Sequence, residues 1–407
     1  MISALLIIVT ALTLAYLLAE LMKPLGLPRS VGQIAAGLIL SIGFIKSLVA
    51  TPEGLDSLAF LANLGIILLF YYVGLETNFK VFTKHVKSSL LVSIFNTAIP
   101  LILGFVIMKF FFHYDNLVSL LIGISLSVSA QAVSVDILEE LNLLKSKIGN
   151  LIIGTGAIDD AIELVLVTVL LSIFHFTSYA ISPLQLAVNV ILFILAIAAI
   201  RIWILPKALK LFDADRSSTT RFAGAMILVL LIVTLTETLN LGTFIGAIIA
   251  GVLVRQTIFT EKTIPFWEEH DITKSIHILA FGFLVPLFFV WIGMNTNIAL
   301  LANVQSLSFV LLLTVLATVG TIGGTVLATV LNKGTIREGT VLGWGLNAKG
   351  DIELVIASLA LQSAIITQEI FSALVLMSFL TTIISPIVFR KLVLRHRKIK
   401  SHFVSRY

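Results

Sequence analysis

Long apolar stretches alternate with short polar interruptions along the whole chain. Each stretch is about 18 residues or longer, which is the length a helix needs to cross the hydrocarbon core of a bilayer. The stretches are continuously apolar and lack the alternation of a transmembrane β-strand, so helices are the spanning elements. The pattern predicts about thirteen transmembrane helices, with approximate limits at 2–21, 30–49, 57–76, 88–111, 117–138, 148–173, 184–205, 221–240, 242–259, 276–295, 302–331, 339–362 and 369–391.

Composition supports an all-α polytopic membrane protein. Hydrophobic residues make up 58% of the chain and charged residues only 12%, against about 25% in soluble domains. The mean hydropathy is +1.09. The chain contains no cysteine, which excludes disulfides and thiol chemistry. The first apolar run has neither a preceding basic segment nor a following cleavage site, so we expect it to be retained as a helix.

Basic residues predict the orientation. Nearly all of the 27 Lys and Arg residues fall in the polar segments that follow odd-numbered helices. Cytoplasmic loops carry this excess, so the N-terminus is expected outside and the C-terminus in the cytoplasm. The basic tail, residues 392–407, is expected to lie on the cytoplasmic membrane surface.

Two segments recur later in the chain. The segment Gly32–Leu40 reappears as Gly246–Val254, and Gly74–Phe79 reappears as Gly293–Ile298. Both copies are displaced by seven helices, and an odd displacement inverts the second copy in the membrane, as in the inverted repeats of secondary transporters. We therefore predict a first repeat at 1–183, a linker helix at 184–220, a second repeat at 221–391 and the tail at 392–407.

Helices 5 and 12 of this scheme correspond under the repeat, and each carries polar residues at mid-depth. Helix 5 contains Ser129 and Gln131, and helix 12 contains Lys349, Asp351 and Glu353. Irregular backbone at membrane depth is tolerated where it is buried in protein or lines a cavity, so we predict two broken helices that face each other. In the alternative, the serines bond to their own helix and Lys349 snorkels while pairing with Glu353.

Asp159 and Asp160 are adjacent within an otherwise apolar helix. A carboxylate at membrane depth costs roughly 2.5–3.5 kcal/mol, so such residues indicate a functional site. Two neighbouring carboxylates cannot both ionise cheaply, and an entering cation would supply the missing charge and displace a proton. Glu163 shares part of their helix face, either as a third site carboxylate or, as we favour, as a structural partner of Lys349.

Several motifs together resemble the monovalent cation:proton antiporter-2 family, which includes NapA-type sodium/proton antiporters and Kef-type potassium transporters. The family implies a six-helix core in which two broken helices cross beside the aspartate helix, a dimerising panel, and elevator-like alternating access. It implies that Asp160 binds the cation or proton and that Asp159 is its partner. A homodimer in a prokaryotic inner membrane, active in pH homeostasis, is expected. The motifs are Leu27-Pro-Arg-Ser-Val-Gly-Gln-Ile-Ala-Ala-Gly-Leu, Val73-Gly-Leu-Glu, Ile153-Gly-Thr-Gly-Ala-Ile-Asp-Asp, Gly242-Thr-Phe-Ile-Gly-Ala-Ile-Ile-Ala-Gly, Val285-Pro-Leu-Phe-Phe-Val-Trp-Ile-Gly-Met and Asn347-Ala-Lys-Gly-Asp-Ile.

The chain departs from the family pattern at four places. Gln33 stands where the family often has Glu, and Gln131 where it often has Thr. The Arg-Gly-Glu pattern of helix 12 appears as Lys349-Gly-Asp351. Thr321 stands where NapA-type antiporters have a lysine that pairs with the first aspartate. A threonine cannot ionise, so we expect electroneutral exchange of Na⁺ or K⁺ for protons. In the alternative, Asp159 titrates together with Asp160, and two protons are exchanged for each cation with net transfer of charge.

Two other classes of protein were weighed. An intramembrane aspartyl protease needs its two aspartates on different helices, and a passive cation channel usually shows a pore loop or a charge ring and no inverted repeat. We therefore expect an antiporter and no enzyme, without a cofactor or a nucleic-acid partner. No nucleotide-binding domain follows the last helix, so gating by such a domain in this chain is not expected. The spacing of Gly320 and Gly324 predicts close helix packing.

Overall fold

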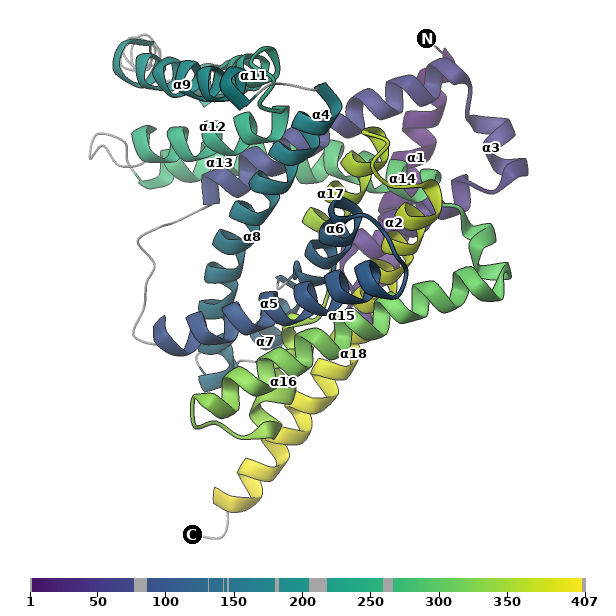
Figure 1. The fold of residues 1–407 in the computed structure, drawn as a ribbon, viewed down its shortest axis with the longest axis vertical. Helices are drawn as coiled ribbons and strands as arrows, with labels where there is room; N and C mark the ends of the chain where they lie inside the picture. The colour runs from purple at the N-terminus through teal and green to yellow at the C-terminus, as the bar shows by residue number, and fades with distance from the viewer. Residues whose placement is uncertain are drawn as a thin grey trace. The chain divides into compact units, whose positions relative to one another are not determined.

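A computed structural model describes residues 2–76, 86–130, 132–141, 143–144, 146–179, 183–204, 218–258 and 266–404 (Figure 1). The regular structure of these residues is helical. The helices form two compact units, each assembled from stretches that are far apart in the sequence. The first unit comprises Met1–Leu12, Ala50–Asn78 and Val167–Phe289, and the second comprises Thr13–Val49, Phe79–Leu166 and Val290–Tyr407.

The first unit is built around the packing of α4 on α12. Helix α12 also packs on α11, and α13 continues through the π-helical turn η3, which lies against α4. A Cβ on Gly74 would lie 3.1 Å from the Cα of Gly251, so the backbones of α4 and α12 touch where these two glycines meet. The elements are α4 (Pro52–Glu76), α9 (Pro183–Ala199), η2 (Ile200–Ile204), α11 (Ser218–Thr238), α12 (Thr243–Ile258), α13 (Phe266–Leu279) and η3 (Ala280–Leu284).

The second unit holds the candidate site. Helix α5 packs on both α6 and α15, and α15 also packs on α16 and α18. A Cβ on Gly320 of α15 would lie 2.7 Å from the Cα of Pro100 in α5, which confirms the predicted close packing at this glycine. The elements are η1 (Lys23–Leu25), α2 (Arg29–Leu40), α3 (Gly43–Val49), α5 (Val86–Phe110), α6 (Asn116–Ser127), α7 (Ala132–Glu140), η4 (Ile298–Ala302), α15 (Val304–Leu331), α16 (Ile336–Leu346), α17 (Asp351–Gln362) and α18 (Gln368–Val404).

Three further helices, α1 (Ile2–Met22), α8 (Lys147–Tyr179) and α14 (Val285–Asn295), contribute residues to both units. In the second unit α2 crosses α14, and a Cβ on Gly37 would lie 2.7 Å from the Cα of Gly293. The sequence repeat equates Gly37 with Gly251 and Gly74 with Gly293. Under the predicted repeat, the Gly37–Gly293 contact in the second unit therefore corresponds to the Gly251–Gly74 contact in the first. Each compact unit draws on both predicted repeats, whose limits remain a prediction.

Helical structure covers each of the predicted spans, with three differences in their limits. The span predicted at 30–49 is two helices, because the chain turns after Leu40, where the Ser41 hydroxyl donates to the carbonyl of Leu38 over 2.7 Å. The span predicted from residue 276 begins at Phe266, and α18 continues into the basic tail as far as Val404. Six of the described helices are long and apolar enough to cross a bilayer, and the number of thirteen remains a prediction.

Candidate functional site

Two broken helices meet in the second unit. Helix α6 ends at Ser127, Val128 is extended with φ −61° and ψ 139°, and α7 begins at Ala132. The second break separates α16, which ends at Leu346, from α17, which begins at Asp351. The N–H of Ala130 in the first break donates to the carbonyl of Ala348 in the second over 2.7 Å. This confirms the predicted pair of crossed broken helices.

Asp159 is held on the buried face of α8. One carboxylate oxygen, Oδ1, accepts a hydrogen bond from the Ser93 hydroxyl of α5. The other, Oδ2, accepts from Nδ2 of Asn96 over 3.1 Å and from the hydroxyl of Ser129 over 3.5 Å. The residue is 0% exposed. Three donors from two different elements therefore fix this carboxylate in the interior.

Asp160 lies in a different environment although it follows directly in the chain. Successive residues of an α-helix point about 100° apart, so the two aspartates leave α8 in different directions. Asp160 is exposed, whereas Asp159 is buried. The pair therefore presents one accessible carboxylate and one that is fixed by hydrogen bonds.

Glu163 lies one turn further along α8 and is also buried. Its Oε1 accepts from the backbone N–H of Ser129 over 2.7 Å and from the Ser129 hydroxyl over 3.3 Å. Glu163 thus satisfies a backbone donor that the break between α6 and α7 leaves without a helical partner. Ser129 links this carboxylate to Asp159, because its hydroxyl lies within hydrogen-bond distance of both.

Lys349, in the break between α16 and α17, brings a positive charge to these carboxylates. Its side chain is 0% exposed, and its Nζ donates to Oγ1 of Thr321 over 3.2 Å. The ammonium interacts electrostatically with Glu353, Glu163 and Asp159. The favoured pairing of Lys349 with Glu163, and the alternative pairing with Glu353, do not form within 4.0 Å among the described residues, because the ammonium turns toward α15 instead.

Glu353 belongs to the first turn of α17, as does Asp351. The N-terminus of a helix favours negative charge, which helps to compensate both carboxylates there. Glu353 is 0% exposed, and its two carboxylate oxygens have no hydrogen-bond partner in the described part of the chain. The charge of Lys349 and the hydroxyl of Ser378 in α18 both help to compensate this carboxylate.

Sequence reasoning missed the α5 side of the site. Ser89, Ser93 and Asn96 lie at intervals of four and three residues, so they share one face of a helix that is otherwise largely apolar. This spacing is visible in the sequence and could have marked the face that meets Asp159. Of the predicted residues, Gln131 lies outside the described residues. The structure brings Ser129, Glu163, Thr321 and Lys349 together around Asp159.

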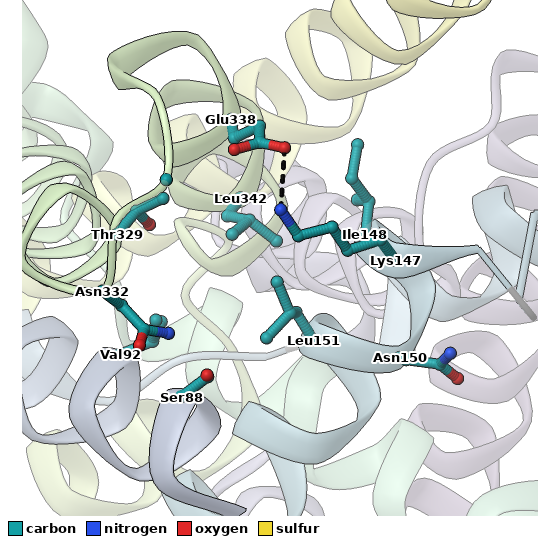
Figure 2. Close-up of a pocket in the computed structure, with 11 residues that line it drawn as sticks. Ser88, Val92, Lys147, Ile148, Asn150, Leu151, Thr329, Asn332, Glu338 and Leu342 are labelled. Carbon is teal, nitrogen blue, oxygen red and sulfur yellow. Dashed lines mark hydrogen bonds and ion pairs between the residues drawn. The ribbon is translucent and has the colours of Figure 1, made fainter. Parts of the chain in front are cut away.

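A cavity of about 390 Å³ opens in the second unit. Figure 2 shows the residues that line it. It lies between the first turns of α5, α8 and α16 and the last turn of α15. Lys147 of α8 and Glu338 of α16 form an ion pair of 3.0 Å across it. The backbone N–H of Thr335 and the ammonium of Lys147 hold the pKa of Glu338 below its usual range.

Comparison with known proteins identifies similar chains. The family described as "Sodium/hydrogen exchanger, transmembrane" matches residues 8–395. A Na⁺/H⁺ antiporter of Enterococcus hirae is 24% identical over 91% of this chain and 93% of its own length. The Na⁺/H⁺-K⁺ antiporter GerN of Bacillus cereus is 26% identical over 91% of each chain. Cation/H⁺ antiporter 19 of Arabidopsis thaliana is 28% identical over 94% of this chain, which spans 48% of that relative.

A solved structure shares the fold. The sodium proton antiporter MjNhaP1 of Methanocaldococcus jannaschii superposes with a TM-score of 0.63 and covers 96% of each chain at 16% sequence identity. At this identity the likeness concerns the arrangement of the helices alone. The agreement extends over nearly the entire chain.

Proposed function

The chain belongs to the sodium/hydrogen exchanger family, and from that membership and the geometry of its carboxylates we propose that Asp160 and Asp159 bind Na⁺ or K⁺ in exchange for a proton. It is an integral membrane antiporter of cations and protons. The observation that carries the assignment of the site is the pairing of an exposed Asp160 with a buried, hydrogen-bonded Asp159 on one helix.

Exchange follows from competition for this pair. Asp160 receives the arriving ion because its side chain is accessible, while Asp159 contributes charge from a fixed position. Carboxylate and hydroxyl oxygens are hard ligands and suit alkali cations. Since two adjacent carboxylates repel, the pair holds a proton when no cation is present, and an arriving cation displaces that proton. Alternating access then carries either ion, but not both at once, across the membrane.

We propose that the exchange is electroneutral. Thr321 cannot ionise, and in this proposal Lys349, whose ammonium donates to Thr321 and interacts with Glu353, Glu163 and Asp159, keeps its proton throughout the cycle. One proton is then traded for each monovalent cation. Lys349 serves as a fixed compensating charge for Glu353, Glu163 and Asp159. Sustained currents in a membrane-adsorbed vesicle layer after a cation jump would contradict this stoichiometry.

The test of the site is Asp160→Asn, because asparagine keeps the volume but can neither titrate nor supply charge. Purified protein in sealed vesicles is given an outward cation gradient, and internal pH is followed with a trapped dye. We expect Asp160→Asn to abolish the pH change and Asp136→Asn, at an exposed carboxylate of α7, to preserve it. Full exchange by Asp160→Asn would refute the assignment. A flow of cations without protons would favour a channel, and hydrolysis of a membrane substrate would favour a protease.

The proposed assembly and location rest on the sequence. We propose a homodimer in a prokaryotic cell membrane with the N-terminus outside, working by an elevator movement and contributing to pH homeostasis. The transported ions are substrates, and the proposed mechanism needs no resident cofactor and no enzymatic step. The two halves 1–183 and 221–391 are proposed as inverted repeats, supported by the correspondence of the Gly37–Gly293 and Gly251–Gly74 contacts.

A further inference from the structure

The cavity between α5, α8, α15 and α16 carries polar groups among the aliphatic side chains of its lining, and it has no role in the scheme above. Its volume of about 390 Å³ has room for several water molecules, since one water occupies about 30 Å³ in the liquid. Hydroxyl and amide groups of Ser88, Asn150, Thr329 and Asn332 line it together with the Lys147–Glu338 ion pair (Figure 2). Such a site has the polar partners that water requires.

Two buried hydroxyls lie between the cavity and Asp159. Ser89 and Thr155 are 2% and 0% exposed, and neither Ser89 Oγ nor Thr155 Oγ1 has a hydrogen-bond partner in the described part of the chain. Thr97 of α5 is likewise buried and without a partner there, whereas other buried threonines bond to their own helix. The buried threonines Thr314 and Thr325 of α15 donate to carbonyls of their own helix four residues back, over 2.8 Å each. An unpartnered buried hydroxyl calls for an explanation, and an ordered water is the simplest one.

Ser89 and Thr155 lie in the sequence between residues that line the cavity and residues that contact or form the Asp159 site. Ser88 lines the cavity, Ser89 is the next residue, and Ser93 one turn further donates to Asp159. On α8, Leu151 lines the cavity and Thr155 lies one turn beyond it. Eight residues of α-helix separate Leu151 from Asp159, which corresponds to about 12 Å along the helix axis.

Gly154 lets the two helices approach. A Cβ at Gly154 would lie 2.6 Å from the hydroxyl oxygen of Ser89, so the serine hydroxyl occupies the space beside this glycine of α8. Ser89 and Ser93 are four residues apart on α5, and Thr155 and Asp159 are four residues apart on α8, so each pair shares one face of its helix. Water bound along these faces would satisfy the hydroxyls of Ser89 and Thr155 and would continue toward Ser93.

We propose that the cavity extends past Ser89 and Thr155 as a water-filled passage that reaches the buried side of Asp159. The inference rests on the proposed function, and it adds a second aqueous access to the site, separate from the exposed side chain of Asp160. The passage opens at the end of the unit that carries Lys147 and Glu338. It supplies the buried carboxylate with the solvent that turnover requires.

Cysteine accessibility tests the passage directly, because the natural chain contains no cysteine. The full-length protein in detergent is treated with 2-aminoethyl methanethiosulfonate. We expect Ser88→Cys and Thr155→Cys to be labelled, and Thr314→Cys, at a buried threonine whose hydroxyl is bonded to its own helix, to stay unlabelled. Ser89→Cys provides a second position in the proposed passage if Thr155→Cys does not fold. Labelling of Thr155→Cys and Ser89→Cys no faster than Thr314→Cys would overturn the proposal.

Filling the cavity with a large side chain tests whether water enters the passage from the cavity and whether the passage is needed for exchange. Ser88→Trp fills the cavity, and Arg337→Trp, at an exposed residue of the same end outside the cavity lining, is its matched control. We expect Ser88→Trp to suppress labelling of Thr155→Cys and to slow exchange, and Arg337→Trp to do neither. Unchanged labelling of Thr155→Cys in the presence of Ser88→Trp would overturn the passage. Unchanged exchange by Ser88→Trp would overturn its role in transport. Because labelling does not depend on transport, failure of the exchange assignment itself would leave the labelling result intact.

Discussion

Removing the buried charge of Lys349 should be among the most destabilising single changes in the second unit. The ammonium is 0% exposed and compensates Glu353, Glu163 and Asp159. Removing one partner of a contacting buried ion pair costs about 3–5 kcal/mol, because the remaining charge is left uncompensated. Lys349 lies more than 4.0 Å from these carboxylates, so we expect a cost near the lower end of this range. Lys349→Met keeps most of the volume of the side chain, so nearly all of its effect should be electrostatic.

Glu353 provides the internal control for this prediction. Its two oxygens have no hydrogen bond within 3.5 Å in the described residues, and glutamine can still accept from the nearby Ser378 hydroxyl, so Glu353→Gln removes mainly the charge. The double variant Lys349→Met/Glu353→Gln should recover about 1–3 kcal/mol relative to the sum of the single effects, the range expected for directly coupled residues. The free energies come from reversible unfolding titrations in mixed micelles, followed by tryptophan fluorescence. Additive effects would show that Lys349 does not compensate Glu353 and would refute the electrostatic reasoning.

Three further changes have defined outcomes. Asn96→Leu should lower the free energy of unfolding by about 1.5–3 kcal/mol, because it removes a hydrogen bond to a charged group, and the unfolding titration measures it. Glu338→Gln removes the ion pair with Lys147. It should lower the free energy of unfolding by under about 1 kcal/mol, because solvent screens this pair. The pKa of Glu338 is lower in the folded protein than in the unfolded chain, where it is about 4.3. The stabilisation is therefore present above the unfolded pKa and is lost as the pH falls through the folded pKa. The melting temperatures of wild type and Glu338→Gln, measured by thermal unfolding, should become equal at low pH. Gly37→Val should lower the free energy of unfolding by about 3 kcal/mol or more, because backbone atoms fill the space beside this glycine. Gly43→Val is the control, since nothing lies within 4 Å of its Cβ position, and it should change the free energy of unfolding by under about 0.5 kcal/mol. Equal melting temperatures of the two variants would contradict this.

The broken helices could be predicted because polar residues at membrane depth have few physical explanations. The segments around Ser129 and Lys349 interrupt apolar sequence, and lipid excludes unpaired backbone. The backbone bond from Ala130 to Ala348 joins the two breaks where these interruptions fall. The same reasoning predicted that Asp159 and Asp160 belong to a functional site, because an ionisable residue at membrane depth has a high free-energy cost.

The contacts of the charged groups could not be predicted from spacing alone. Glu163 and Glu353 are at helical distances from candidate partners, but spacing along one helix does not say which neighbouring helix supplies a donor. Glu163 bonds to the backbone of Ser129, and Lys349 reaches Thr321 on α15. Both choices depend on how the breaks redirect the chain. Ser93 and Asn96 escaped prediction because single polar residues are common on packed helices.

The bond between Ala130 and Ala348 has a consequence for biosynthesis. During synthesis the first break emerges more than 200 residues before its partner, so its peptide groups lack that bond until the second break has been made. The halves on either side, α6 and α7, contain 12 and 9 residues, and neither alone matches the roughly 20 residues that cross a bilayer. The buried carboxylates of α8 also lack their counter-charge until Lys349 has been synthesised. The second unit must therefore reach its final packing late, after the last third of the chain is in place, and a nascent chain that stops before α16 should remain a target for membrane quality control.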